Sequence, residues 1–459
     1  MWIPSYIGGK AVTTISASAF LNNTSLLKVV VPSTVTSIGN DILKGCNNVE
    51  SLTVPFVNGV LGRYFGEASN DRGRVGSGAC TSTSDYTHQY TLTTTGYFSN
   101  DRSYWYYCFN IPKTLTEVII TVQPEIPENA FRNCDLIQKI SIPSTATSIG
   151  EYAFYNCKSV TSYNENNGAS TLPDAITVIP NYAFTNNTNI SHLIISSDIA
   201  YIGEYAFSGC SNLVELSTAK VPEKLAEIGQ YAFSGCSALE KYFNNAKGEL
   251  NLPTSMNTIG KCAFKGNALV KKVLIPNSVQ TIGYAAFEDC NEIQELSVPF
   301  INSVLGRYFG EASNNSGTTG SGAKTSTSDY THQWTESANG GYFSNGKGYW
   351  IYCYKIPKSL QKVVVTKQTE IPDNAFRNCD LIEEIVIADN TLAIGEYAFY
   401  NCSALTNIYI PNTVETIGSY AFTGCTSLTI TCGAVSRPTG WASNWNSSNC
   451  TVYWNKSKA

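Results

Sequence analysis

Residues 203–213 read GEYAFSGCSNL, and close versions of this stretch recur along the chain. It returns as GEYAFYNC at 150–157 and 395–402, as GQYAFSGC at 229–236 and as GSYAFTGC at 418–425. The phenylalanine of the motif most often returns after 23 residues. A fixed period of this length is typical of a solenoid, in which each repeat packs only against its neighbours.

One period can be interpreted physically from residue 134 to residue 157. The segment CDLIQKISIP ends in an alternation, Ile140–Ser141–Ile142, that predicts a short strand, and Pro143 ends it. A second apolar segment closes on Gly150, and EYAFYNC then predicts a single helical or 3₁₀ turn. Such a unit buries its apolar face only when neighbours stack on it, with parallel strands about 4.8 Å apart.

A longer duplication lies over the short repeat. LGRYFGEASN at 61–70 returns at 305–314, and TSTSDYTHQ at 81–89 returns at 325–333. Each copy carries an insertion rich in Gly, Ser, Thr and Tyr, which we interpret as long loops and not as independent domains. The predicted divisions are N-terminal repeats 1–55, a first insertion 56–110, central repeats 111–299, a second insertion 300–355, C-terminal repeats 356–430 and a cap 431–459.

The composition excludes several classes of partner. Only 14% of the 459 residues are charged, and the net charge is −5. This field is too weak to attract nucleic acid or an anionic membrane. No apolar run approaches the roughly 18 residues of a membrane helix, so we expect no membrane insertion. Since Ile3-Pro4 resembles the middle of a later repeat, we expect the chain to begin inside a longer protein.

The regular cysteines raise the question of chemistry. Where the motif lacks cysteine it has asparagine, at Asn23, Asn187 and Asn267. Both side chains are small and can donate to a backbone carbonyl, whereas asparagine supplies neither a nucleophile nor a zinc thiolate. We therefore predict buried structural thiols, with no metal and no cofactor, and we leave open a bridge between Cys432 and Cys450. The ladder positions are Cys46, Cys134, Cys157, Cys210, Cys236, Cys290, Cys379, Cys402 and Cys425.

The three histidines offer little catalytic chemistry. His88 and His332 lie in the duplicated SDYTHQ, where Ser84 and Asp85 suggest a Ser–Asp–His triad. Triad members must converge around an oxyanion hole, and three such residues close in sequence more often form a hydrogen-bonded turn. We favour the turn. His192 is expected to be a solvated surface residue, and no catalytic residue is predicted.

Aromatic clusters in the insertions are the candidate binding residues. GRYFGE occurs in both copies, and SYWYYCF in the first corresponds to GYWIYCYK in the second. Tyr and Trp are favoured at interfaces, although these rings could instead fold the insertions onto the solenoid. Outward positions of the strands form a second candidate surface. The aromatic candidates are Tyr64, Phe65, Tyr104, Trp105, Tyr106, Tyr308, Phe309, Tyr349, Trp350 and Tyr352.

The pattern xxLxxIxIPxxVxxIGxxAFxxC resembles the BspA-like leucine-rich-repeat family of bacterial cell-surface proteins. The resemblance covers nearly the whole chain outside the insertions. It implies an α/β repeat solenoid, right-handed, with coils of about 23 residues, a parallel sheet and no enzyme activity. The tail 431–454 is similar to the closing segment of such arrays, in which Trp441, Trp445 and Trp454 would cover the last core face.

The resemblance also implies a location at the cell surface or outside the cell, and a role in adhesion. We therefore expect a non-enzymatic protein that binds host or bacterial surface proteins, or glycans, through its sheet face and aromatic insertions. The alternatives are a spacer that projects another domain and a carbohydrate-binding module. The sequence leaves the ligand, the mode of attachment and the oligomeric state open.

Overall fold

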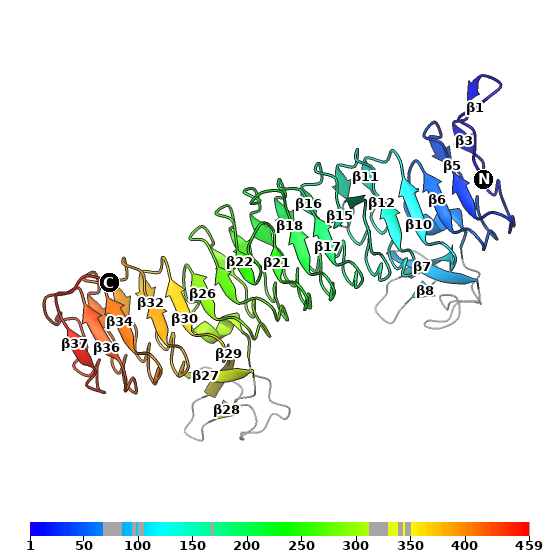
Figure 1. Ribbon diagram of the computed structural model, residues 1–459. Helices are drawn as coiled ribbons and strands as arrows, with labels where there is room; N and C mark the ends of the chain where they lie inside the picture. The colour runs from blue at the N-terminus through cyan, green and yellow to red at the C-terminus, as the bar shows by residue number, and fades with distance from the viewer. Residues whose placement is uncertain are drawn as a thin grey trace. The chain divides into compact units, whose positions relative to one another are not determined.

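The computed structural model describes residues 1–67, 85–93, 98–99, 105–166, 169–311, 329–337, 343–344 and 350–458. They form two compact units, Met1–Leu239 and Glu240–Ala459. Each unit is a stack of coils joined by parallel strands, which confirms the predicted solenoid (Figure 1). Within the described ranges the only helices are two short 3₁₀ helices, η1 (Leu61–Tyr64) and η2 (Leu305–Tyr308).

In the first unit two sets of parallel strands run along the stack, one on each side of the coils. The wider set contains β4 (Lys28–Val30), β6 (Ser51–Val54), β10 (Glu117–Ile120) and β12 (Lys139–Ser141) in spatial order, then β15 (Ala169–Thr171), β17 (His192–Ile194) and β19 (Glu215–Ser217), with β14 (Glu165–Asn166) antiparallel to β15. The narrower set contains the pair β3 (Thr14–Ile15) and β5 (Ser37–Ile38), the pair β11 (Glu125–Ile126) and β13 (Ser148–Ile149), and the row β16 (Val178–Ile179), β18 (Tyr201–Ile202) and β20 (Glu227–Ile228). A hairpin of β1 (Tyr6–Ile7) and β2 (Lys10–Ala11) precedes them.

The second unit has the same two sets of strands. Its wider set is one parallel sheet of eight strands, β22 (Glu249–Asn251), β24 (Lys272–Leu274), β26 (Glu295–Val298), β30 (Lys362–Val365), β32 (Glu384–Val386), β34 (Asn407–Ile410), β36 (Thr429–Cys432) and β37 (Thr451–Tyr453), in that order. The narrower set contains β23 (Thr258–Ile259) with β25 (Thr281–Ile282), and β31 (Glu370–Ile371), β33 (Ala393–Ile394) and β35 (Thr416–Ile417). The short strand β21 (Lys241–Tyr242) begins the unit.

Stacked phenylalanines form the centre of the core. Phe184 and Phe207 have ring centroids 5.4 Å apart, and Phe207 and Phe233 repeat that distance. All three side chains are almost completely buried. The segment around each phenylalanine is a run of tight turns, because the residue two positions before it adopts a left-handed backbone, as Tyr205 does at φ 54°. Because a left-handed residue interrupts a right-handed helix, this segment forms tight turns and no regular helix.

The cysteines close these turns, as predicted. The Cys210 thiol donates a hydrogen bond to the carbonyl of Phe184, one coil earlier, at 3.1 Å. Asn187 makes the equivalent bond to Phe154 at 2.7 Å through its side-chain amide. Burial raises the pKa of the Cys210 thiol to about 12. Cysteine and asparagine therefore supply the same donor, and the asparagine side-chain oxygen also accepts a hydrogen bond from a tyrosine hydroxyl, Tyr163 for Asn187. The same thiol-to-phenylalanine bond is made by Cys46, Cys157, Cys236, Cys290, Cys402 and Cys425, at 3.0–3.1 Å.

One position of the coil is occupied by glycine in some coils and by proline in others, and the choice decides whether the coil offers a backbone amide to the coil before it. A Cβ on Gly150 would lie 2.3 Å from the amide nitrogen of Glu128, so only glycine permits this approach of two coils. The Gly150 amide then bonds to Ile126 O at 2.8 Å. Pro127, Pro180 and Pro372 stand in place of this glycine directly after β11, β16 and β31, the first strands of their rows. Since proline has no amide hydrogen, each row begins without an orphan donor.

The insertions contain more regular structure than the predicted loops. The first forms an antiparallel sheet of β7 (Tyr86–Thr93), β9 (Trp105–Pro112) and β8 (Phe98–Ser99), in the order β7-β9-β8. The second repeats it with β27 (Tyr330–Ser337), β29 (Trp350–Pro357) and β28 (Phe343–Ser344). The prediction that SDYTHQ forms a turn was therefore wrong, because most of the motif lies in β7 and β27. Figure 1 shows each sheet beside the coils of its own unit.

Two of the tryptophans expected in the cap lie inside the end of the second unit. Trp441 and Trp445 are buried, and their ring centroids lie 4.8 Å apart in a T-shaped arrangement. The Trp441 indole donates to Val414 O at 3.1 Å. The bridge considered between Cys432 and Cys450 is absent, because both thiols are free. Cys450 instead donates to Cys425 O at 3.3 Å and so extends the thiol ladder into the cap.

Candidate binding face and its anchors

The eight-stranded sheet of the second unit carries an ordered row of charges on its outer face. The strand register aligns Glu249, Lys272, Glu295, Lys362 and Glu384 on five successive strands. The Lys272–Glu295 pair is 3.3 Å long and the Lys362–Glu384 pair is 2.9 Å long. The hydrogen bond from Lys362 to Glu384 raises the pKa of that lysine. The row therefore alternates in sign and stays partly exposed.

A second outward row lies two residues further along the same strands. Val364, Val386 and Tyr409 are half-buried there, and Tyr453 on the last strand is 52% exposed. Between the two rows run inward residues such as Val363, which is fully buried. The face thus places apolar and aromatic side chains beside a line of paired charges. A mixture of this kind is typical of protein interfaces.

The corresponding face of the first unit is more polar. The Ser51 hydroxyl on β6 donates a hydrogen bond to the Glu117 carboxylate on the neighbouring strand β10 at 2.7 Å. His192 is exposed, as predicted, and its Nδ1 lies 3.0 Å from Ser191 Oγ. His192 aligns with Glu215 on the next strand.

A tyrosine ladder in the first unit was missed by the sequence analysis. Tyr152, Tyr182, Tyr205 and Tyr231 stack face to face, with ring centroids 4.6–4.8 Å apart. Arg132 covers the outer face of Tyr152, its guanidinium carbon 4.5 Å from the ring centroid. Burial and the neighbouring Tyr152 raise the pKa of Tyr182 to about 12. The tyrosine of GEYAF recurs at the repeat period, which was the available signal.

The aromatic candidates of the GRYFGE motif lie inside the fold. Tyr64 and Phe65 are fully buried, and Tyr308 and Phe309 are 1% exposed. The Tyr64 hydroxyl donates to Phe56 O at 2.6 Å. These four rings pack each insertion against its coil, the alternative that the sequence left open, and in this arrangement they offer almost no surface to a ligand.

The other aromatic candidates belong to the second motif of each insertion. Trp105 and Tyr106 lie on β9, and Trp350 and Tyr352 lie on β29. Their side chains, and the whole of Tyr104 and Tyr349, lie outside the described residues. A binding role for the aromatic residues stays a prediction.

Two glutamines that the sequence analysis overlooked hold the insertions in place. Gln89 on β7 is fully buried, and its side-chain oxygen accepts the Gly62 amide at 2.7 Å. Its NH₂ group donates to Asn129 O at 3.1 Å and Ala130 O at 3.0 Å. Gln333 makes the same three bonds in the second copy. One side chain thus ties the inserted strand to two coils.

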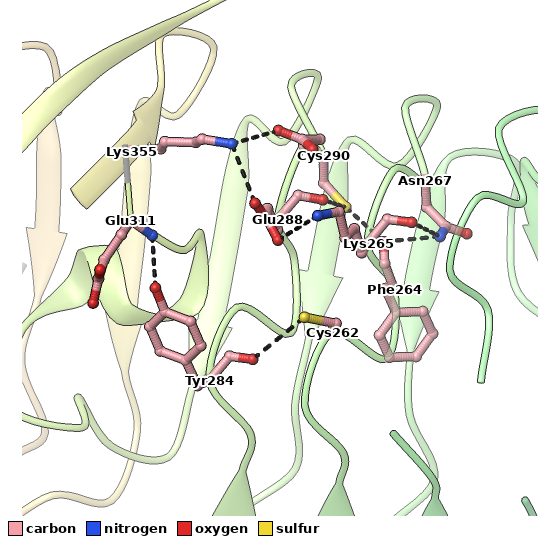
Figure 2. Close-up of polar contacts among 10 residues, drawn as sticks. Cys262, Phe264, Lys265, Asn267, Tyr284, Glu288, Cys290, Glu311 and Lys355 are labelled. Carbon is pink, nitrogen blue, oxygen red and sulfur yellow. Dashed lines mark hydrogen bonds and ion pairs between the residues drawn. The ribbon is translucent and has the colours of Figure 1, made fainter. Parts of the chain in front are cut away.

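The second insertion has an additional ionic anchor (Figure 2). Lys355 on β29 contacts Asp289 at 2.8 Å and Glu288 at 3.3 Å, and Glu288 also pairs with Lys265 at 2.8 Å. Burial opposes the charge on Lys355, but its hydrogen bonds to both carboxylates raise its pKa. The cluster is stabilising because its charges balance around a half-buried lysine.

The remaining chemical candidates lie in or beside the inserted strands. His88 and His332 are buried on β7 and β27, whereas Ser84 and Ser328 lie outside the described residues. Asp85 accepts a hydrogen bond from Asn47 at 3.2 Å. Cys108 is disulfide-bonded, and its partner lies outside the described residues. In the part of the chain that is described, no three His, Cys, Asp or Glu side chains gather as a metal site would need.

Comparison with known proteins identifies the repeat. The model of the BspA-type leucine-rich-repeat region matches the chain in six copies, over residues 5–70, 124–249, 240–318 and 351–433. No curated protein matches the sequence significantly. A search for helices of the length and apolarity of a membrane span found none within the described ranges.

Solved structures with similar architecture include three bacterial proteins. A leucine-rich-repeat protein from Bacteroides ovatus is 20% identical, with 99% of this chain and 91% of that chain covered and a TM-score of 0.46. A leucine-rich cell-surface protein from Faecalibacterium prausnitzii is 19% identical, with 84% and 97% covered and a TM-score of 0.32. A leucine-rich-repeat protein from Eubacterium ventriosum is 19% identical, with 71% and 85% covered and a TM-score of 0.31.

Proposed function

Because the chain belongs to the BspA-type leucine-rich-repeat family, we propose that it is a non-enzymatic bacterial protein that binds other proteins outside the cell. The proposed partners are surface proteins of host or bacterial cells. The observation that carries the proposal is the outer face of the eight-stranded sheet, where a charge row runs beside a row of apolar and aromatic side chains.

The geometry of this face favours a protein partner over a small molecule. Parallel strands about 4.8 Å apart repeat the same side-chain position many times, so the face is long and shallow. Small ligands need a concave pocket that surrounds most of their surface. A protein partner can instead match the alternating charges of Lys272, Glu295, Lys362 and Glu384 and cover Tyr409.

The charge row supplies specificity more than affinity. Each ion pair in the row is partly exposed, and such pairs contribute at most about 1 kcal/mol. A partner with the complementary alternation would be selected, and one out of register would bring like charges together. The apolar row, centred on Val364, Val386 and Tyr409, would supply the buried contacts.

The test is a screen of the chain against extracellular-matrix proteins, bacterial cell surfaces and a glycan array. A protein ligand found there should bind the K272E/K362E variant and Tyr409→Ala at least tenfold more weakly. Lys224→Glu, the same change of charge at an exposed ion pair of the first unit, is the matched control and should bind normally. Binding that is unaffected by the face variants would contradict the proposal.

The two alternatives have distinct outcomes in the same screen. A carbohydrate-binding module would bind on the glycan array and no protein. A spacer would bind nothing in any arm.

A further inference from the structure

Because the chain is duplicated, the coil that carries the first insertion can be compared residue by residue with the coil that carries the second. Residues 37–67 and 281–311 align without a gap. The shared positions include Arg63 and Arg307, and Glu67 and Glu311. Four of the positions that differ in chemistry lie at one place, the junction of coil and insertion, whereas others, such as Ser51 and Glu295, lie on the strands of the wider sheet. At the junction, Asn40 corresponds to Tyr284, Asp41 to Ala285, Lys44 to Glu288, and Phe109 to Tyr354.

In the second copy a tyrosine fills this junction. The Tyr284 hydroxyl accepts a hydrogen bond from the Glu311 amide at 2.8 Å, as Figure 2 shows. The Arg307 guanidinium carbon lies 5.9 Å from the centroid of the Tyr284 ring. Burial raises the pKa of Tyr284. The junction therefore accommodates a phenol ring, with a backbone donor at its hydroxyl and a guanidinium over its face.

In the first copy the same place is a cavity of about 470 Å³, lined by Asn40, Asp41, Lys44, Arg63, Glu67 and Phe109. Asn40 is too short to take the position of the Tyr284 ring. Among the described residues, no group accepts a hydrogen bond from the Glu67 amide, the counterpart of the Glu311 amide. The first copy thus keeps the donor of the junction and lacks the phenol that satisfies it.

The charges around the cavity favour a neutral ligand. Asp41 and Glu67 balance Lys44 and Arg63, and Asp41 already pairs with Lys44 at 3.7 Å. A free anion or cation would face one repulsive group for each attractive one. Phe109 adds an aromatic wall. A neutral ring with a single hydroxyl meets all of these groups without leaving a charge unpaired.

We propose that the cavity at the base of the first insertion binds a phenol group, which takes the place that Tyr284 occupies in the second copy. The hydroxyl accepts the Glu67 amide hydrogen, and the ring lies beneath Arg63. The phenol is either a small free molecule or the side chain of a tyrosine in a peptide. The inference does not depend on the binding face of the eight-stranded sheet.

The experiment measures ¹⁹F line broadening of 4-fluorophenol in the presence of the full chain. The wild-type chain should broaden the line. Asn40→Tyr, which copies the second junction into the first, should reduce the broadening at least tenfold. Tyr284→Asn, which copies the first junction into the second, should increase it about twofold. Equal broadening by the wild type and Asn40→Tyr, including no broadening by either, would overturn the proposal.

Competitors test the hydroxyl and distinguish the two sources of phenol. N-acetyltyrosinamide should displace the probe at least tenfold better than N-acetylphenylalaninamide, and equal displacement would contradict the role of the Glu67 amide. If the neutral 4-methylphenol competes tenfold better than N-acetyltyrosinamide, the natural ligand is a small molecule, and the reverse order indicates a peptide.

A measurement on the unmodified chain protects the test from a variant that fails to fold. Saturating 4-fluorophenol should slow hydrogen exchange of the Glu67 amide at least tenfold and leave the Glu311 amide unchanged. Unchanged exchange at Glu67 would overturn the proposal independently of the variants.

Discussion

A regular coil and an insertion coil satisfy their buried backbone groups in different ways. In the coil of Cys210, the thiol reaches back to the Phe184 carbonyl, so a residue within the coil completes it. In the coil of Gly62, the Gln89 side chain reaches in from β7 and satisfies one amide and two carbonyls. The comparison teaches that the insertion is part of the solenoid core, because the coil at its base is complete only with the inserted strand.

On the side of the narrower set of strands, too, a glutamine side chain makes hydrogen bonds that the backbone of a neighbouring strand makes in a regular coil. A regular coil places a short strand there, whereas the insertion coil has none. Gln123 accepts the Val57 amide at 2.8 Å and donates to Val57 O at 3.2 Å, and Gln368 bonds to Ile301 in the same way. Side-chain amides therefore replace missing ladder bonds on both sides of the insertion coils.

Alkaline pH should have the largest effect on stability, because it acts on the buried thiols of the regular coils. The folded pKa values of Cys210 and Cys290 are raised to about 12, above the usual 9.0. Folded chain therefore holds these protons while unfolded chain loses them as pH rises above about 9, and stability falls. Each buried thiol removes about 1.4 kcal/mol per pH unit in that window. Chemical denaturation between pH 8 and pH 10.5 should show a loss of several kcal/mol, and constant stability would contradict the ladder.

Replacement of the buried glutamine should have the next largest effect. Gln89→Leu leaves the buried Gly62 amide without an acceptor, whereas the carbonyls of Asn129 and Ala130 each keep one backbone donor. Because an unsatisfied buried group costs about 1–3 kcal/mol, we expect a destabilisation of that size in urea unfolding, and the same for Gln333→Leu. Gln138→Leu, at an exposed position, is the control with no expected change. A Gln89→Leu variant as stable as the wild type would show that the insertion is only appended.

A single thiol should matter less. Cys210→Ala removes one hydrogen bond and a small buried group and should cost about 1–2 kcal/mol. Cys210→Asn keeps a donor, as Asn187 does one coil earlier, but it buries a side-chain oxygen that lacks the tyrosine hydroxyl bonded to Asn187, and it should recover little of that loss. Thermal unfolding of both variants checks this expectation. An asparagine variant as stable as the wild type would show that the tyrosine hydroxyl is not needed.

The smallest effect is expected on the outer face. Lys362→Ala removes a partly exposed ion pair with Glu384 and should change stability by less than about 1 kcal/mol. Urea unfolding of the variant and of the wild type should show this small difference. A loss larger than that of Gln89→Leu would mean that the charge row holds the sheet together and is not available to a partner.

Much of the regular coil could be predicted because its signals are local and repeated. The exchange of Cys210-type cysteines for Asn187-type asparagines predicted the donor role before any distance was known. The inserted strands were missed because TSTSDYTHQ was judged by its composition, although Thr87, Gln89 and Thr91 alternate with the residues between them. The role of Gln89 has no local signal, since its partner Ala130 lies far along the chain.

The site at the first junction shows a different limit. The differences between Asn40 and Tyr284 are visible in the duplicated sequence, but their meaning requires knowing that Tyr284 contacts the Glu311 amide. The stack of Tyr182 and Tyr205 was hidden for a related reason, because a left-handed backbone at each tyrosine directs the rings to one edge. Repeats predict which residues are equivalent, and only the structure shows what they touch.

Hydrogen exchange at the Gly62 amide tests the central claim most directly, because that amide is bonded to the inserted Gln89 side chain and, among the described residues, to no other acceptor. We expect the amide to exchange as slowly as that of Cys210 in the wild type, and at least tenfold faster in Gln89→Leu, with Cys210 unchanged. Exchange at Gly62 as fast as at an exposed loop in the wild type would contradict the account, because the inserted strand would then not complete the coil.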